Sequence, residues 1–102
     1  MFLHGCAGLP RRQQAWADEL SREGYAVLVL DSFGARGITR VCGDGGAFPG
    51  AARALDPFAA VRGLREVAWV DRSRIAAVGW SHGGWTTHWA LVRQGEHPAE
   101  RL

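Results

Sequence analysis

The sequence predicts an α/β fold, with a three-layer core in which helices cover a parallel sheet of about three strands. Apolar, β-rich runs alternate along the chain with segments of helical periodicity, and glycine-containing turns separate them. Hydrophobic residues make up 47% of the 102 residues, which is typical of a globular protein and allows one domain at most. Because buried parallel strands normally have neighbours on both sides, we expect residues 1–102 to be the middle part of a larger domain.

The first strand and the first helix are predicted within the first quarter of the chain. Phe2-Leu3 is an apolar segment shorter than the usual strand of about 5–6 residues, and we interpret it as the end of a strand. Residues 10–23 predict an amphipathic helix, because Pro10 suits a first helical position and Gly24 suits a helix stop. Its apolar face is predicted to carry Trp16, Ala17 and Leu20.

A second strand is predicted at residues 25–30, a continuous apolar run without alternation. Such a run is typical of a strand buried on both faces of a parallel sheet. It ends at Asp31, which we interpret as a carboxylate that braces the following loop. Residues 32–50 contain many glycines and predict a loop.

The second half of the chain predicts a helix, a strand and a further helix. Asp56-Pro57 suits an N-cap and a first helical position, and residues 74–78 predict the third strand. The last helix is expected to begin at Gly83-Gly84 and to end at Gly95. The two helices are predicted to bury Phe58, Val61, Leu64 and Ala68, and Trp85, Trp89 and Val92, respectively.

The segment Gly79-Trp80-Ser81-His82-Gly83 lies between the third predicted strand and the last helix. A Gly-x-Ser-x-Gly in this position is the nucleophile-elbow pattern of serine hydrolases. The serine of such an elbow sits on a sharp, strained turn, so side chains two residues before and after it would collide with the turn. Gly79 and Gly83 remove those side chains, which leaves the Ser81 hydroxyl projecting from the end of the sheet.

Charge and hydropathy exclude several classes of function. The chain has 12 arginines and no lysine, scattered among 10 acidic residues for a net charge of +2. This distribution lacks the basic stripe that nucleic-acid binding requires. No apolar run approaches the roughly 18 residues that span a bilayer, so we expect no membrane span. The sequence gives no indication of an oligomeric state.

Two cysteines, Cys6 and Cys42, lie in different predicted loops. They cannot form a structural zinc site alone, because such a site needs four ligands and the chain has no Cys-x-x-Cys. We interpret them first as two unpaired thiols, with a disulfide between the loops as the alternative. A disulfide would indicate a periplasmic or secreted protein, whereas unpaired thiols are compatible with the cytoplasm.

Three segments, each after a predicted strand, together resemble the dienelactone hydrolase family, which has the α/β-hydrolase fold. They are His4-Gly5-Cys6-Ala7-Gly8-Leu9, Asp31-Ser32-Phe33-Gly34-Ala35-Arg36-Gly37 and Gly79-Trp80-Ser81-His82-Gly83-Gly84. The resemblance extends from His4 to about Gln94. It implies a hydrolase that acts on ester or lactone carbonyls of small molecules through an acyl-enzyme, without a metal or an organic cofactor. Dienelactone hydrolases place a cysteine where this chain has Ser81, so a general esterase or a peptidase-like hydrolase is at least as well supported.

The resemblance also implies roles for individual residues. Ser81 corresponds to the nucleophile, and the backbone N–H groups of Cys6 and His82 correspond to the donors of an oxyanion hole. His4 and Gly5 belong to the oxyanion loop, in which His4 is interpreted as a structural hydrogen-bonding residue. The His82 imidazole is expected to point away from the serine.

The acid and the base of a catalytic triad are not identified in the sequence. In an α/β-hydrolase they follow the nucleophile, and the candidates after Ser81 are Glu96, His97 and Glu100. These residues lie beyond a predicted helix of about 12 residues, roughly 18 Å from the elbow, whereas a general base must lie within about 3 Å of the hydroxyl. We therefore reject them and expect the C-terminal acid and histidine region, like the N-terminal strands, to lie outside residues 1–102. The chain alone is then expected to be inactive.

Two alternative functions are considered beside the hydrolase. One is a truncated, non-catalytic α/β protein. The other is a nucleotide- or phosphate-binding module, because the glycines around Ser81 follow a strand and open a helix. The second alternative is disfavoured, since the chain lacks both the Gly-Lys-Ser/Thr of a P-loop and the Gly-x-Gly-x-x-Gly of a dinucleotide-binding fold.

Overall fold

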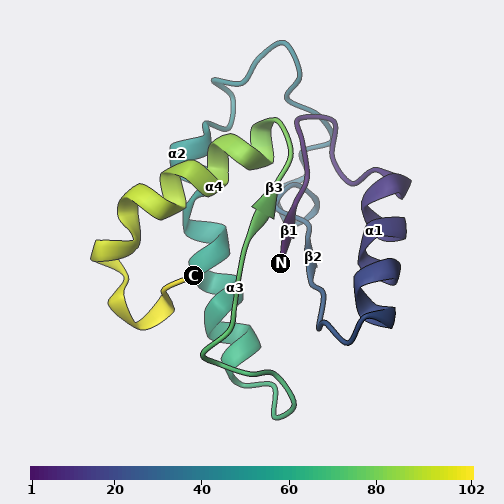
Figure 1. The fold of residues 1–102 in the computed structure, drawn as a ribbon. Helices are drawn as coiled ribbons and strands as arrows, with labels where there is room; N and C mark the ends of the chain where they lie inside the picture. Colours follow the sequence, from purple (N-terminus) through teal and green to yellow (C-terminus); the bar gives the residue numbers. More distant parts are fainter.

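A computed structural model describes all residues, 1–102, and contains a parallel sheet of three short strands. The strands are β1 (Phe2–Leu3), β2 (Val29–Leu30) and β3 (Val78–Gly79), and their order in the sheet is β2-β1-β3. In the register of the sheet, Phe2 pairs with Val29 on one side and with Val78 on the other. The first strand of the chain is therefore the central strand of the sheet (Figure 1).

Four α-helices complete the layers. They are α1 (Arg11–Arg22), α2 (Gly50–Arg53), α3 (Leu55–Arg65) and α4 (His82–Arg93), and short 3₁₀ turns occupy Gly34–Arg36, Gln94–Glu96 and Pro98–Glu100. Helix α1 lies on one side of the sheet, and α3 and α4 lie on the other (Figure 1). The predicted three-layer α/β architecture is thus confirmed. None of the helices has both the length and the hydrophobicity that crossing a bilayer requires.

The prediction that residues 25–30 are buried on both faces is wrong. Only Val29 and Leu30 are in strand conformation, and Tyr25 at the start of the run is 61% exposed. The physical reason is the position of β2 at the edge of the sheet, where β1 is its only neighbour and leaves its other side uncovered.

The predicted start of the third helical segment also needs correction. Helix α3 begins at Leu55 with Ala54 as its N-cap, so Asp56 lies in the first turn rather than at the cap. The Asp56 carboxylate instead binds the guanidinium of Arg36, with contacts of 2.7 Å and 3.0 Å. Ala68, predicted in the buried stripe, lies beyond the end of the helix and is exposed.

The buried face of α4 differs from the predicted one. The helix begins at His82, and its buried residues are His82, Gly83, Thr86 and Ala90, whereas Trp85 and Val92 are 43% and 61% exposed. The cause is close packing on the sheet: a side chain at Gly83 would overlap the backbone carbonyl of Leu3 in β1. The small Gly83 therefore lies against β1, and the large ring of Trp85 stays partly exposed. A similar difference occurs in α1. Trp16, predicted on its apolar face, is 55% exposed, whereas Gln13 and Ala17 are buried.

The hydrophobic core lies between α3 and α4, on one side of the sheet. Ala54, Phe58 and Ala90 form a buried cluster between α3 and α4, and Trp89 and Leu102 pack against it. Helix α2 was not predicted, because it has only four residues and begins at Gly50, the last residue of the glycine-rich segment 32–50. Gly50 allows α2 to approach α4 closely, since a side chain at this position would overlap the ring of Trp85. This missed helix places Arg53 beside the candidate site.

Candidate active site

Ser81 lies on a strained turn between β3 and α4. Its backbone angles are φ 52° and ψ −117°, and it is the only residue other than glycine with a positive φ. Such a conformation costs about 1–3 kcal/mol and persists only where the surroundings enforce it. Here the neighbouring glycines permit it, because a Cβ at Gly79 would overlap the carbonyl of Gly83. The Ser81 residue is exposed, and its hydroxyl makes no hydrogen bond within the chain.

The loop that follows β1 lies directly against this turn. A Cβ built on Gly5 would lie 3.5 Å from the carbonyl oxygen of Trp80 and 3.6 Å from the Cβ of Ser81. The N–H groups of Cys6 and of His82 make no hydrogen bond within the chain. Two free backbone donors therefore flank the segment that carries the Ser81 hydroxyl.

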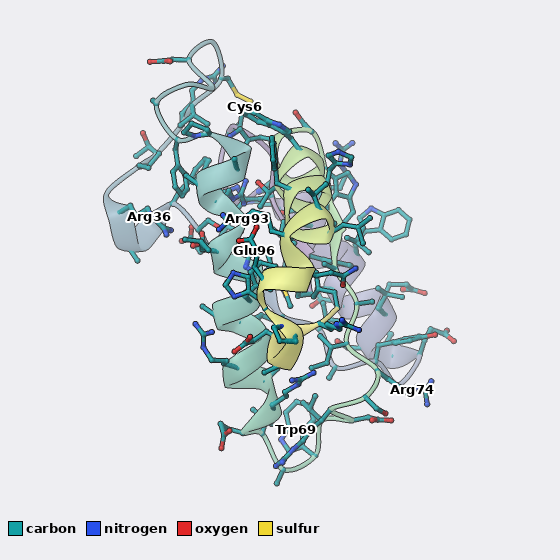
Figure 2. The ribbon with its side chains drawn as sticks, turned by 90° about the vertical axis from the view of Figure 1, so that its left-hand side faces the viewer. Cys6, Arg36, Trp69, Arg74, Arg93 and Glu96 are labelled. Atoms are coloured by element: carbon teal, nitrogen blue, oxygen red, sulfur yellow. A yellow bond between two sulfur atoms is a disulfide. The ribbon has the colours of Figure 1, made fainter.

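The loop after β1 is also held by contacts with residues 39–42. Cys6 and Cys42 form a disulfide, visible as the yellow bond beside Cys6 in Figure 2, so the interpretation as two unpaired thiols is wrong. The carbonyl of Cys6 also accepts a hydrogen bond of 2.8 Å from the N–H of Val41. Gly8 has a φ of +86°, and a side chain there would lie 3.2 Å from the carbonyl oxygen of Thr39.

His4 is fully buried beneath the loop and has a structural environment. Its Nδ1 lies 2.8 Å from the carbonyl oxygen of Gly5, and its ring packs edge-on against Phe33. Burial lowers the pKa of His4. Its Nε2 lies 3.8 Å from the carboxylate of Asp31. That carboxylate accepts hydrogen bonds from the N–H groups of Phe33 and Gly34, which lower the pKa of Asp31, so Asp31 braces its loop as expected.

The imidazole of His82 has both nitrogens occupied away from Ser81. Its Nε2 lies 2.9 Å from the carbonyl oxygen of Phe48, and a carbonyl can only accept, so Nε2 carries the proton. Its Nδ1 then accepts a hydrogen bond of 3.0 Å from Arg53. Burial lowers the pKa of His82, and the nearby Arg53 charge acts in the same direction. The ring is therefore neutral and fixed in one tautomer.

A cleft of about 290 Å³ opens beside Ser81. The loop after β1 forms one wall, and the start of α1 forms another. The side chains that give the cleft its character are Arg12, Gln13, Trp16 and Trp80. The exposed position of Trp16 thus supplies apolar surface to the candidate site rather than to the core.

A larger cavity of about 870 Å³ lies at the other end of the sheet. Apolar side chains dominate its lining, and Tyr25, Trp69 and Ile75 are among them. Figure 2 shows Trp69 and Arg74, which also lines this cavity, at the end of the molecule opposite Cys6. The larger cavity contains no strained nucleophile, whereas Ser81 lines the smaller cleft. The smaller cleft is therefore the candidate active site.

The residues after α4 have partners of their own. Glu96 pairs with Arg93 at 3.0 Å, as Figure 2 illustrates, and Glu100 pairs with Arg62 at 3.0 Å. The His97 ring stacks on Phe58. None of them hydrogen-bonds to Ser81, in line with their rejection as triad members. No three His, Cys, Asp or Glu side chains gather closely enough to hold a metal ion.

Three residues of the site were not predicted from the sequence, namely Arg53, Arg12 and Trp16. Arg12 and Trp16 were assigned only to a helix, and no motif marks them. Arg53 had one usable signal, since it is a lone charge among apolar residues in Ala51-Ala52-Arg53-Ala54-Leu55. A charged residue in such a run is either exposed or buried with specific partners.

The three-layer fold and the Ser81 elbow define the class of protein as a serine-type α/β-hydrolase. The sequence matches the prolyl oligopeptidase family over residues 12–97, which is most of the chain, and the chain belongs to that family. Among solved structures, none matches this chain. The family is one of α/β-hydrolases, in agreement with the broader part of the resemblance described above.

Proposed function

We propose that this protein hydrolyses small-molecule esters or lactones, with Ser81 as the nucleophile. The Ser81 oxygen would lose its proton and attack the carbonyl carbon, and the C–O bond of the ester would break to give an acyl-enzyme and an alcohol that takes up the proton. In a lactone the ring opens and the alcohol stays attached to the acyl group. Water would then release the acid and regenerate the hydroxyl. The observation that carries the proposal is the strained, exposed Ser81 with a hydroxyl free of any other partner. No metal or organic cofactor takes part in the proposed reaction.

The negative charge that develops on the substrate oxygen would be held by the N–H groups of Cys6 and His82. Both donors are free within the chain, and both lie in segments that contact the Ser81 turn. Donors fixed in advance at such a position stabilise the transition state because they need no reorganisation. The loss of one donor in other hydrolases costs about 3–4 kcal/mol of barrier.

The general base and its acid partner are proposed to come from outside residues 1–102. The His82 ring is occupied by Phe48 and Arg53, and His4 is fully buried. The His97 ring stacks on Phe58. Without a base the serine hydroxyl stays a weak nucleophile, so residues 1–102 alone are proposed to have no more than trace activity.

The size of the cleft supports a small substrate of the dienelactone-hydrolase type. Ligand sites usually measure about 300–1,000 Å³, and the cleft beside Ser81, at about 290 Å³, is at the lower limit. Its Trp16 and Trp80 side chains suit an apolar acyl group. The second candidate function is cleavage of peptide bonds, which the membership in the prolyl oligopeptidase family favours.

The proposal is tested by labelling the native protein with a fluorophosphonate, a reagent that reacts with activated serines. We expect one adduct, which peptide mapping assigns to Ser81, and no adduct in the Ser81→Ala variant. The intact mass of the native product is recorded in the same experiment, and a value above 11.1 kDa would agree with a base outside residues 1–102. Absence of an adduct at Ser81 would refute the hydrolase proposal.

The two candidate substrates are separated by turnover. p-Nitrophenyl acetate and a simple γ-lactone report esterase and lactonase activity, and a prolyl p-nitroanilide reports peptidase activity. Faster turnover of the ester and the lactone would support the first candidate, and faster turnover of the anilide would support the second. Ser81→Ala is the control in each assay.

A further inference from the structure

Arg53 is a fully buried cation without a hydrogen-bonded carboxylate partner. Its guanidinium lies over the face of Phe33 at 5.0 Å, and its Nε and Nη2 atoms make no hydrogen bond. Burial lowers the pKa of Arg53 to about 10, so it keeps its charge at neutral pH. A buried charge with unused donors is unfavourable for stability, and an apolar side chain of similar size would often serve as well. The arrangement therefore points to a role other than stability.

The contacts that Arg53 does make converge on the candidate active site. Its Nη1 donates to the carbonyl oxygen of His4 at 2.8 Å and to Nδ1 of His82 at 3.0 Å. His4 is the first residue of the loop that carries Cys6, and His82 directly follows Ser81. One nitrogen atom thus ties together the two segments that carry the free N–H groups.

We infer that Arg53 is a positioning residue that fixes the Cys6 loop relative to the start of α4, so that the two free N–H groups point to one substrate oxygen. The inference rests on the proposed hydrolase function, since it assigns a purpose to that arrangement. Arg53 does not touch the substrate. It acts through the main chain of His4 and the ring of His82.

The contact with His82 has a spectroscopic signature that is independent of activity. In the native protein labelled with ¹⁵N-histidine, His82 is expected to show a protonated Nε2 and an unprotonated Nδ1 that accepts a hydrogen bond. In Arg53→Met, Nδ1 loses its donor, and its ¹⁵N resonance is expected to shift. Arg62→Met is the matched control, because Arg62 is an exposed arginine that pairs with Glu100.

The effect on the site is measured as the rate of fluorophosphonate labelling at Ser81. We expect Arg53→Met to slow labelling by at least about tenfold, within the roughly hundredfold that a 1 Å misplacement costs. Arg53→Lys keeps the charge and can donate to both acceptors, but not with the planar geometry of a guanidinium. Its rate is expected to lie between those of the wild type and Arg53→Met, and Arg62→Met is expected to react at the wild-type rate.

A wild-type labelling rate in either folded Arg53 variant would overturn the inference. If Arg53→Met does not fold, as judged by circular dichroism, the rate of Arg53→Lys decides. If the wild-type protein itself is not labelled, the proposed function fails. The contact between Arg53 and His82 is then tested by NMR alone. A His82 spectrum that is unchanged in Arg53→Met would refute this contact.

Discussion

Cys6 and Cys42 join the loop after β1 to the segment before α2, across a sequence separation of 36 residues. The same two segments share the hydrogen bond from the N–H of Val41 to the carbonyl of Cys6. The Cys6 loop is therefore held by a disulfide and a main-chain hydrogen bond to the same segment. Its position depends on a covalent bond as well as on Arg53.

Removal of this disulfide is expected to destabilise the protein. Closing a loop of this length restricts the unfolded chain by about 4 kcal/mol, so Cys42→Ser should lower the free energy of unfolding by a similar amount. Urea unfolding of both proteins measures this difference in the free energy of unfolding. Dithiothreitol should destabilise the wild type and leave Cys42→Ser unchanged, and equal stability of the wild type with and without reductant would contradict the expectation.

Gly83→Ala is expected to be severely destabilising. The added Cβ would overlap the carbonyl of Leu3, which cannot move away without losing its hydrogen bond from the N–H of Trp80. We expect a loss of about 3 kcal/mol in the free energy of unfolding. The control is Gly63→Ala in α3, where a Cβ meets nothing within 4 Å. That variant should be stabilised by about 0.5–1 kcal/mol, and similar effects in the two variants would refute this reasoning.

Ser81→Gly is expected to stabilise the fold while it abolishes labelling. Glycine adopts the positive φ of this position without strain, so the variant should gain about 1 kcal/mol. Ser81→Ala keeps the strain and serves as the matched variant without a hydroxyl. Thermal unfolding of the three proteins measures the difference. A Ser81→Gly variant no more stable than Ser81→Ala would show that the turn stores no strain.

Stability is expected to fall as the pH is lowered from 7 to 5. Burial lowers the pKa of both His4 and His82, so below about pH 6.5 the unfolded chain binds more protons than the folded protein. The free energy of unfolding must then decrease with decreasing pH. The pKa of Asp31 is also lowered, but Asp31 changes the free energy of unfolding only below about pH 4. It therefore has no effect between pH 5 and 7.

The dependence is measured by urea unfolding at intervals of pH between 5 and 7. His82→Gln is a neutral variant that retains a donor and an acceptor, and it should show a smaller decrease than the wild type. A wild-type protein that is equally stable at both ends of the range would contradict the assignment of neutral, buried imidazoles.

The parts of the site that a local motif encodes were predictable from the sequence. Gly79 and Gly83 marked the turn at Ser81, because their positions follow directly from the collision of side chains in a sharp bend. The loop at Gly5 was located by its place after a strand. The parallel sheet followed from the alternation of strand-like and helical segments.

The parts that depend on packing distance were not predictable. In α4 the large aromatic residues were expected to be buried, but Gly83 brings the helix so close to β1 that only small side chains fit between them. Helix α2 consists of four residues within and just after a glycine-rich segment, too short for its periodicity to be recognised. Arg53 acquires its partners only when α2 packs against α4, so no local pattern could reveal them.

The order β2-β1-β3 has a consequence for how the protein comes to be folded. Of these three strands the central one is synthesised first, and its partners Val29 and Val78 follow later in the chain. During synthesis β1 can pair with β2 first, but its other edge stays unpaired until β3 has left the ribosome. Pairings between such distant segments make folding slow, and the unpaired edge of β1 is open to association until β3 is available. The third strand and the turn at Ser81 are adjacent in the chain, so a chain arrested before residue 78 lacks both.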